Sequence, residues 1–169
     1  RDGTDVVRGA EVFEFQYEVR TIADLVPGMG DGEVLVGTAG DDQLAGAMGY
    51  DLVQGLDGND FLGGGAANDT LEGGAGDDYL RGDFGDDLLA GGDGIDVAGY
   101  QGWSGDYVVT LDSATGELTI ADRMFGRDGT DRVIGVEQFA FLDGVWSAQD
   151  LVDLQLAGVA PPPTEPAFL

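Results

Sequence analysis

A nine-residue repeat runs through the middle of this chain. Seven consecutive units lie between Gly37 and Gly99, and each begins with Gly and carries Asp at its sixth position. The eighth position is Leu or Val in six units and the smaller Ala98 in the seventh. A unit with one large apolar side chain cannot bury it alone, so the units are expected to stack on one another.

The spacing predicts coils of two units each. Glycines in the first six positions permit positive φ angles, so we expect a turn there, followed by a three-residue strand whose central side chain points inward. Turns two units apart then lie on the same edge of the stack. The aspartates expected to meet are Asp42/Asp60, Asp60/Asp78 and Asp78/Asp96 on one edge, and Asp51/Asp69 and Asp69/Asp87 on the other.

The repeat resembles the RTX family of calcium-binding nonapeptide repeats, G-G-x-G-x-D-x-U-x with U a large apolar residue. Close copies are Gly73–Arg81 and Gly91–Val97, and the resemblance covers 63 of the 169 residues. It implies an all-β fold: a right-handed parallel β-roll with flanking β-rich caps. The candidate metal-site residues are the sixth-position aspartates and first- and fourth-position glycines: Asp42, Asp51, Asp60, Asp69, Asp78, Asp87, Asp96, Gly37, Gly40, Gly46, Gly49, Gly55, Gly58, Gly73 and Gly76.

The residue types favour calcium over other metals. The chain has no Cys and no His, so carboxylate and carbonyl oxygens are the available ligands. Ca²⁺ takes six to eight such oxygens at roughly 2.3–2.6 Å, whereas zinc and copper prefer nitrogen or sulfur. The interturn pairs predict about five ions in the roll. Glu33 replaces Asp in a degenerate leading unit, residues 28–36, and with Asp51 would form a weaker sixth site.

Several units depart from the family pattern. Ala67 replaces the fourth-position Gly, and four other residues replace the second-position Gly: Thr38, Ala47, Leu56 and Asp83. These changes put in doubt the geometry of the loops around Asp51 and Asp69, although every aspartate is retained.

Charge excludes several functions and predicts metal-dependent folding. The net charge of −26 argues against nucleic acid or an anionic membrane surface as a partner. No segment is apolar enough for a transmembrane span. Without His, no Ser-His triad can form, and we expect the module not to be an enzyme. Because stacking crowds the carboxylates, the metal-free array is expected to be disordered and to fold on binding calcium.

The sequence predicts that the whole chain divides into four segments. Residues 1–26 resemble residues 127–152, so residues 1–27 are interpreted as the closing segment of an earlier block. Residues 28–99 form the roll. Residues 100–157 are a cap with a hairpin (107–111 and 117–120) and a helix near 148–155 after Ser147. Residues 158–169 are a Pro-rich tail.

Two smaller features have alternative interpretations. The turn Asp128–Asp131 is interpreted as a plain strand entry, with a further ion site as the alternative. Four aromatic residues are expected to cover the last coil, with a sugar-stacking surface as the alternative: Tyr100, Trp103, Tyr107 and Trp146.

The resemblance also implies a biological role. We expect the chain to be the C-terminal block of a larger protein secreted by a Gram-negative bacterium, with calcium, its own upstream domains and a type 1 secretion channel as partners. Folding outside the cell would assist export. The alternative is a Ca²⁺-dependent module that binds a polysaccharide or a cell surface.

Overall fold

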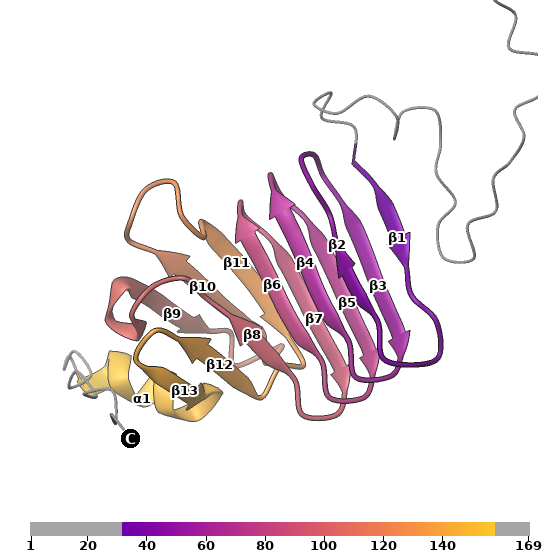
Figure 1. Cartoon of the computed structure of the whole chain (residues 1–169). Coiled ribbons are helices and arrows are strands. Elements are labelled where there is room, and N and C mark those ends of the chain that lie inside the picture. The colour runs from indigo at the N-terminus through magenta and orange to yellow at the C-terminus, as the bar shows by residue number, and fades with distance from the viewer. Residues whose placement is uncertain (1–31, 158–169) are drawn as a thin grey trace, which may run out of the picture.

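The computed structural model describes residues 32–157, which form two sheets joined by turns (Figure 1). The seven-stranded sheet has the order β1 (Val34–Val36), β3 (Leu52–Asp57), β5 (Thr70–Ala75), β7 (Leu88–Asp93), β11 (Thr130–Ile134), β10 (Leu118–Asp122), β9 (Tyr107–Leu111). The six-stranded sheet has the order β13 (Gly144–Ser147), β12 (Gln138–Phe141), β8 (Val97–Gly99), β6 (Tyr79–Phe84), β4 (Phe61–Ala66), β2 (Gln43–Ala45).

The chain alternates between the two sheets, so each coil contributes one strand to each of them. Strands of neighbouring coils pair in parallel at a spacing of 18 residues, as in Val53↔Leu71 and Leu62↔Leu80. The predicted parallel β-roll is therefore confirmed, with two nonapeptide units to a coil.

The interior strands are longer than predicted. The strands β3 to β7 each have six residues rather than three, because they continue through the first three positions of the next unit. Those positions also pair with the neighbouring coil, as in Leu56↔Gly74 and Asp57↔Ala75. The expectation of a six-residue turn was wrong for this reason.

Eighth-position side chains fill the space between the sheets. Six of them are fully buried: Val53, Leu62, Leu71, Leu80, Leu89 and Ala98. Leu35 and Leu44, in the first described coil, are partly buried against the same core. The small Ala98 lies in register with Phe139 of β12, which is itself 0% exposed. The roll therefore continues beyond the repeat array, with the large Phe139 side chain in register with the small Ala98 side chain.

The cap contains the predicted hairpin and helix. The strands β9 and β10 pair antiparallel, with Leu111 opposite Leu118. The short η2 (Ser104–Asp106) precedes them, and α1 (Ala148–Ala157) packs against β9 and β13. At the start of α1, the backbone N–H of Asp150 donates to Ser147 Oγ (3.2 Å) and Ser147 Oγ–H donates to Asp150 Oδ2 (2.7 Å).

The aromatic residues of the cap are divided between core and surface. Tyr100 and Tyr107 are buried and pack against Phe141, with ring centroids 5.1–5.2 Å apart. Trp146 is partly buried against the core. Trp103 is 46% exposed, so it does not cover the last coil as predicted.

The predictions for residues 1–27 and for the Pro-rich tail lie outside the described residues. Within residues 32–157, no helix is long and apolar enough to cross a membrane.

Candidate metal centre

The sixth-position aspartates form a ladder along each edge of the roll. In six of them one carboxylate oxygen, Oδ1, accepts the backbone N–H of the residue 18 positions earlier. The five predicted pairs all lie side by side with N···Oδ1 distances of 2.8–2.9 Å: Asp42/Asp60, Asp51/Asp69, Asp60/Asp78, Asp69/Asp87 and Asp78/Asp96. Glu33 begins the ladder through its backbone N–H, which donates to Asp51 Oδ1 (2.6 Å).

The second carboxylate oxygen is without a partner in the interior units. The Oδ2 atoms of five aspartates are buried and accept no hydrogen bond: Asp60, Asp69, Asp78, Asp87 and Asp96. An unsatisfied buried polar atom costs about 1–3 kcal/mol, and more when charged. The stacked roll therefore gathers negative oxygens that require a cation or a proton.

Each Oδ2 lies against the glycine that opens its own unit. At Gly55 and Gly73, a Cβ would collide with the Oδ2 of Asp60 or Asp78 and with the first-position carbonyl oxygen of the next coil, 2.6 Å away in both cases. The same overlap occurs at Gly37 and Gly46. Glycine is needed at the first position of these units because the carboxylate and the carbonyl occupy the place of a side chain.

Fourth-position glycines are needed for a different reason, which is their backbone conformation. Gly49, Gly58 and Gly76 have φ angles of 121°, 120° and 133°. A Cβ on Gly58 or Gly76 would overlap the backbone of the preceding coil, whereas a Cβ on Gly40, in the first described turn, meets nothing within 4 Å.

The backbone conformation of the second-position residue determines whether the aspartate Oδ2 has a hydrogen-bond donor. In the first two units this position is Thr38 or Ala47, and its N–H donates to the Oδ2 of the same unit's aspartate, Asp42 (2.5 Å) or Asp51 (3.1 Å). In the next five units the second position has a φ between 67° and 125°, even where it is Leu56 or Asp83. Non-glycine residues therefore retain the left-handed backbone there, and Oδ2 is left without a donor.

Burial also changes the acidity of these groups. It raises the pKa of Asp69 and Asp78 to about 6 and that of Asp87 to about 7, with neighbouring aspartates adding to the effect. The N–H bond from the adjacent coil lowers these pKa values but does not offset burial. When no metal is present, protons therefore bind to these same oxygens near neutral pH.

A second ladder, which the sequence analysis missed, runs through the fifth positions. The N–H groups of Asn59, Asp77 and Ile95 donate to the side-chain oxygens of Asp41, Asn59 and Asp77, respectively, at 2.8–2.9 Å. The sequence feature that could have predicted this ladder is the recurrence of Asp or Asn at the fifth position. This ladder binds coils together in the opposite direction to the sixth-position ladder.

Both edges of the sixth-position ladder continue into the cap, which the sequence analysis also missed. The N–H of Asp87 donates to Asp131 Oδ1 (3.0 Å), and that of Asp96 donates to Glu137 Oε2 (2.9 Å). The strands β11 and β12 extend the two sheets in register with β7 and β8. Residues of the predicted cap thus build one more coil of the roll.

The oxygen-only surroundings fit calcium better than the alternatives. No three Asp or Glu side chains converge on one point within residues 32–157. An ion between coils would therefore be held by a pair of carboxylates together with backbone carbonyl oxygens. Ca²⁺ accepts such mixed and irregular oxygen sets, whereas Mg²⁺ demands a tighter octahedron.

The fold and these ladders define a parallel β-roll of metal-binding nonapeptide repeats. The family described as the RTX calcium-binding nonapeptide repeat (4 copies) matches residues 27–62 and 63–98, so the array consists of repeats of this type. No curated protein has a significantly similar sequence.

Two solved structures resemble the chain in part. The AlgE6R3 subunit of the Azotobacter vinelandii mannuronan C5-epimerase is 22% identical, with a TM-score of 0.46, over 69% of this chain and 82% of that one. The extracellular lipase LipA of Serratia marcescens is 19% identical, with a TM-score of 0.43, over 78% of this chain; the match spans 20% of the lipase.

Proposed function

We propose that this chain is a non-catalytic module that folds when calcium ions enter the spaces between its coils. The supporting observation is the row of five buried aspartate Oδ2 atoms that have no hydrogen-bond partner. Repulsion between those carboxylates opposes stacking, and Ca²⁺ removes it. The free energy of metal binding then becomes free energy of folding.

The proposal extends to where folding takes place. Extracellular calcium modules bind with dissociation constants of about 10⁻⁴–10⁻³ M, so such an array stays open in a cytosol poor in calcium. We infer that it belongs to a larger exported protein of a Gram-negative bacterium and that folding after passage through a type 1 secretion channel prevents its return. The net charge of −26 is consistent with an extended, soluble chain before calcium binds.

A calcium titration followed by far-UV circular dichroism tests the folding step. Strand signal should appear as Ca²⁺ is added and disappear on EGTA addition, while Mg²⁺ at the same concentrations should not produce it. A chelated protein that is as compact as the calcium-loaded one would refute the proposal.

One observation favours a second function, binding of a polysaccharide or cell surface. Phe61 and Tyr79 stack with ring centroids 5.1 Å apart and an interplanar angle of 4°, and Phe61 is 37% exposed. Aromatic pairs of this kind can receive a sugar ring. A glycan pull-down with and without Ca²⁺ separates the two functions, because only the second predicts retention of a glycan by the folded module.

A further inference from the structure

An eighth nonapeptide unit is present in the structure, divided by an insertion. The register of β11 with β7 places Asp131 at a sixth position and Val133 at an eighth. The residues before the insertion, Tyr100 and Gln101, continue from β8 as first and second positions. Residues 102–127, which carry η2 and the β9–β10 hairpin, separate these two from Asp128. Removal of these 26 residues restores the nonapeptide Tyr100-Gln101-Asp128-Gly129-Thr130-Asp131-Arg132-Val133-Ile134.

The hydrogen bonds of this unit match those of uninterrupted ones. The bond from Asp87 N–H to Asp131 spans 44 residues, which is one coil plus the insertion. The Thr130 N–H donates to Asp86 Oδ1 (2.8 Å), as the fifth-position ladder requires. The Gln101 side chain adds a further bond, to Asp83 Oδ1 (2.9 Å). Gly129 has a φ of 73° and lies against the Gly85 carbonyl, as fourth-position glycines do.

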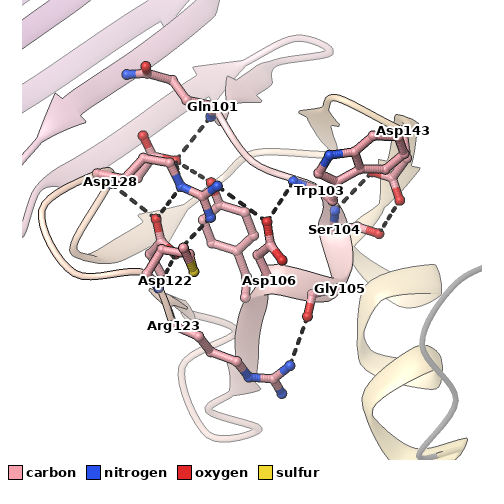
Figure 2. Close-up of polar contacts among 12 residues, drawn as sticks. Gln101, Trp103, Ser104, Gly105, Asp106, Asp122, Arg123, Asp128 and Asp143 are labelled. Atoms are coloured by element: carbon pink, nitrogen blue, oxygen red, sulfur yellow. Dashed lines mark hydrogen bonds and ion pairs between the residues drawn. The ribbon is translucent and has the colours of Figure 1, made fainter. Parts of the chain in front are cut away.

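A polar clamp holds the two ends of the insertion together (Figure 2). The Gln101 N–H donates to Asp128 Oδ2 (3.0 Å), and the Tyr107 hydroxyl donates to the same oxygen. The Arg127 guanidinium donates two bonds to Asp122 (2.6 and 2.8 Å) and one to Asp106 (3.2 Å). The clamp brings the two parts of the divided turn together.

Negative charge without a cationic partner remains at the junction. Asp87 and Asp131 are each 2% exposed, and the Oδ2 of Asp87 has no hydrogen-bond partner. The Tyr100 hydroxyl interacts with the Asp131 carboxylate, and Tyr100 stands at the first position, where uninterrupted units have Gly. A Cβ on Gly82 would meet that oxygen, as at the other first-position glycines. Among residues 32–157, the ion pairs of Arg81, Arg127 and Arg132 are made with other carboxylates.

We propose that Asp87 and Asp131 bind a further calcium ion, which joins the insertion-bearing cap to the roll. This inference rests on the proposed function, since it requires that the roll bind calcium. Its consequence is that the cap is fixed by metal and not by side-chain packing alone. The divided unit would assemble only when the clamp and the ion are both in place.

Ion counting by equilibrium dialysis and elemental analysis tests the site in the full chain. Asp131→Asn keeps the oxygen that accepts the Asp87 N–H but removes the charge, and should bind one Ca²⁺ fewer than the wild-type chain. Asp112→Asn, a matched change at the exposed hairpin turn, should leave the count unchanged. Asp87→Asn should lose two ions, because it also contributes to the pair with Asp69.

Tryptic cleavage after Arg127 gives a second measurement. Because the Arg127 side chain is only 22% exposed within the clamp, calcium should protect this bond in the wild-type chain. Protection of the Asp131→Asn variant should require several-fold more calcium. A wild-type chain that binds no calcium refutes the proposed function itself. Calcium binding by the roll with an unchanged count in Asp131→Asn, or loss of a single ion in Asp87→Asn, overturns only this junction site.

Discussion

Asp131 has the same relationship to Asp87 as Asp87 has to Asp69. In both pairs the earlier residue donates its backbone N–H to the Oδ1 of the later one, at 3.0 Å and 2.8 Å. The first pair is separated by 44 residues and the second by 18. Coils can therefore stack even when a long insertion separates two positions of one turn, provided that the residues after the insertion pair in register.

The number of interturn pairs to which an aspartate belongs predicts the cost of replacing it. Asp78 contacts both Asp60 and Asp96, so Asp78→Ala should impair two sites; Asp69→Ala should behave alike. Asp42 contacts only Asp60 among the described aspartates and should impair one. In a calcium titration by circular dichroism, the midpoint should rise at least about tenfold for Asp78→Ala, equivalent to about 1.4 kcal/mol, and less for Asp42→Ala. A midpoint unaffected by Asp78→Ala would contradict the interturn arrangement.

Backbone conformation predicts a contrast between two glycines. Gly76 has a φ of 133°, and a Cβ there would overlap the Gly58 carbonyl. Gly76→Ala should therefore lower the free energy of unfolding by about 1–3 kcal/mol, measured by denaturant titration in saturating Ca²⁺. Gly40→Ala, where a Cβ meets nothing within 4 Å, is the matched control and should change it by less than about 1 kcal/mol. Equal effects at the two positions would show that stacking does not restrict the fourth position.

The raised aspartate pKa values predict how pH acts on the metal-free roll. In the folded chain, burial raises the pKa of Asp87 to about 7 and that of Asp131 to about 8, above the usual 3.8 of an unfolded chain. Folding therefore takes up protons, so these groups favour the stacked state at low pH, and that contribution is lost as pH rises from about 4, near the usual pKa, to about 8. Strand signal in EGTA should increase from pH 8 to pH 5. Calcium affinity should fall as the pH is lowered from 8 to 5, because protons and Ca²⁺ compete for the carboxylates. Metal-free strand content that grows with rising pH would contradict this.

Packing of the added coil predicts a large effect at Phe139. This side chain is 0% exposed and in register with Ala98, so Phe139→Ala leaves a cavity that no neighbour fills. The free energy of unfolding in saturating Ca²⁺ should fall by about 3–5 kcal/mol. Val145→Ala in β13, where the side chain is 62% exposed, should change it by about 0.5 kcal/mol or less.

The clamp predicts a difference between two arginines of the insertion. Arg127 makes paired bonds to Asp122 and lies 5.1 Å above the Tyr107 ring, a geometry that Lys cannot reproduce. Arg127→Lys should accelerate amide hydrogen exchange within residues 102–127 and leave β3 to β7 unaffected. Arg123 donates a single bond to the Gly105 carbonyl (2.8 Å), so Arg123→Lys should have little effect. Unchanged exchange in Arg127→Lys would show that the clamp does not hold the insertion.

Much of the fold could be predicted from the repeat because each coil contacts only its neighbours. The period of nine places Asp60 next to Asp78 and Leu62 next to Leu80 without knowledge of any distant segment. The hairpin and the helix after Ser147 could be predicted because turn and capping signals are local. The strand length could not, because pairing through Leu56 and Asp57 depends on the neighbouring coil.

The period and the stacking of the aspartates follow from residues at a constant spacing, and the oxygen-only chemistry follows from the absence of Cys and His, so the chain specifies all three without its fold. The tertiary structure alone decided which carboxylate oxygens are left without a donor, because the φ angle at positions such as Ala47 and Leu56 sets the direction of the N–H. It also decided where the roll ends. Asp131 joins its ladder after an insertion of 26 residues, and Glu137 joins the other ladder after a turn that is shorter than those of the repeats. Contacts across those separations have no periodic signal in the chain.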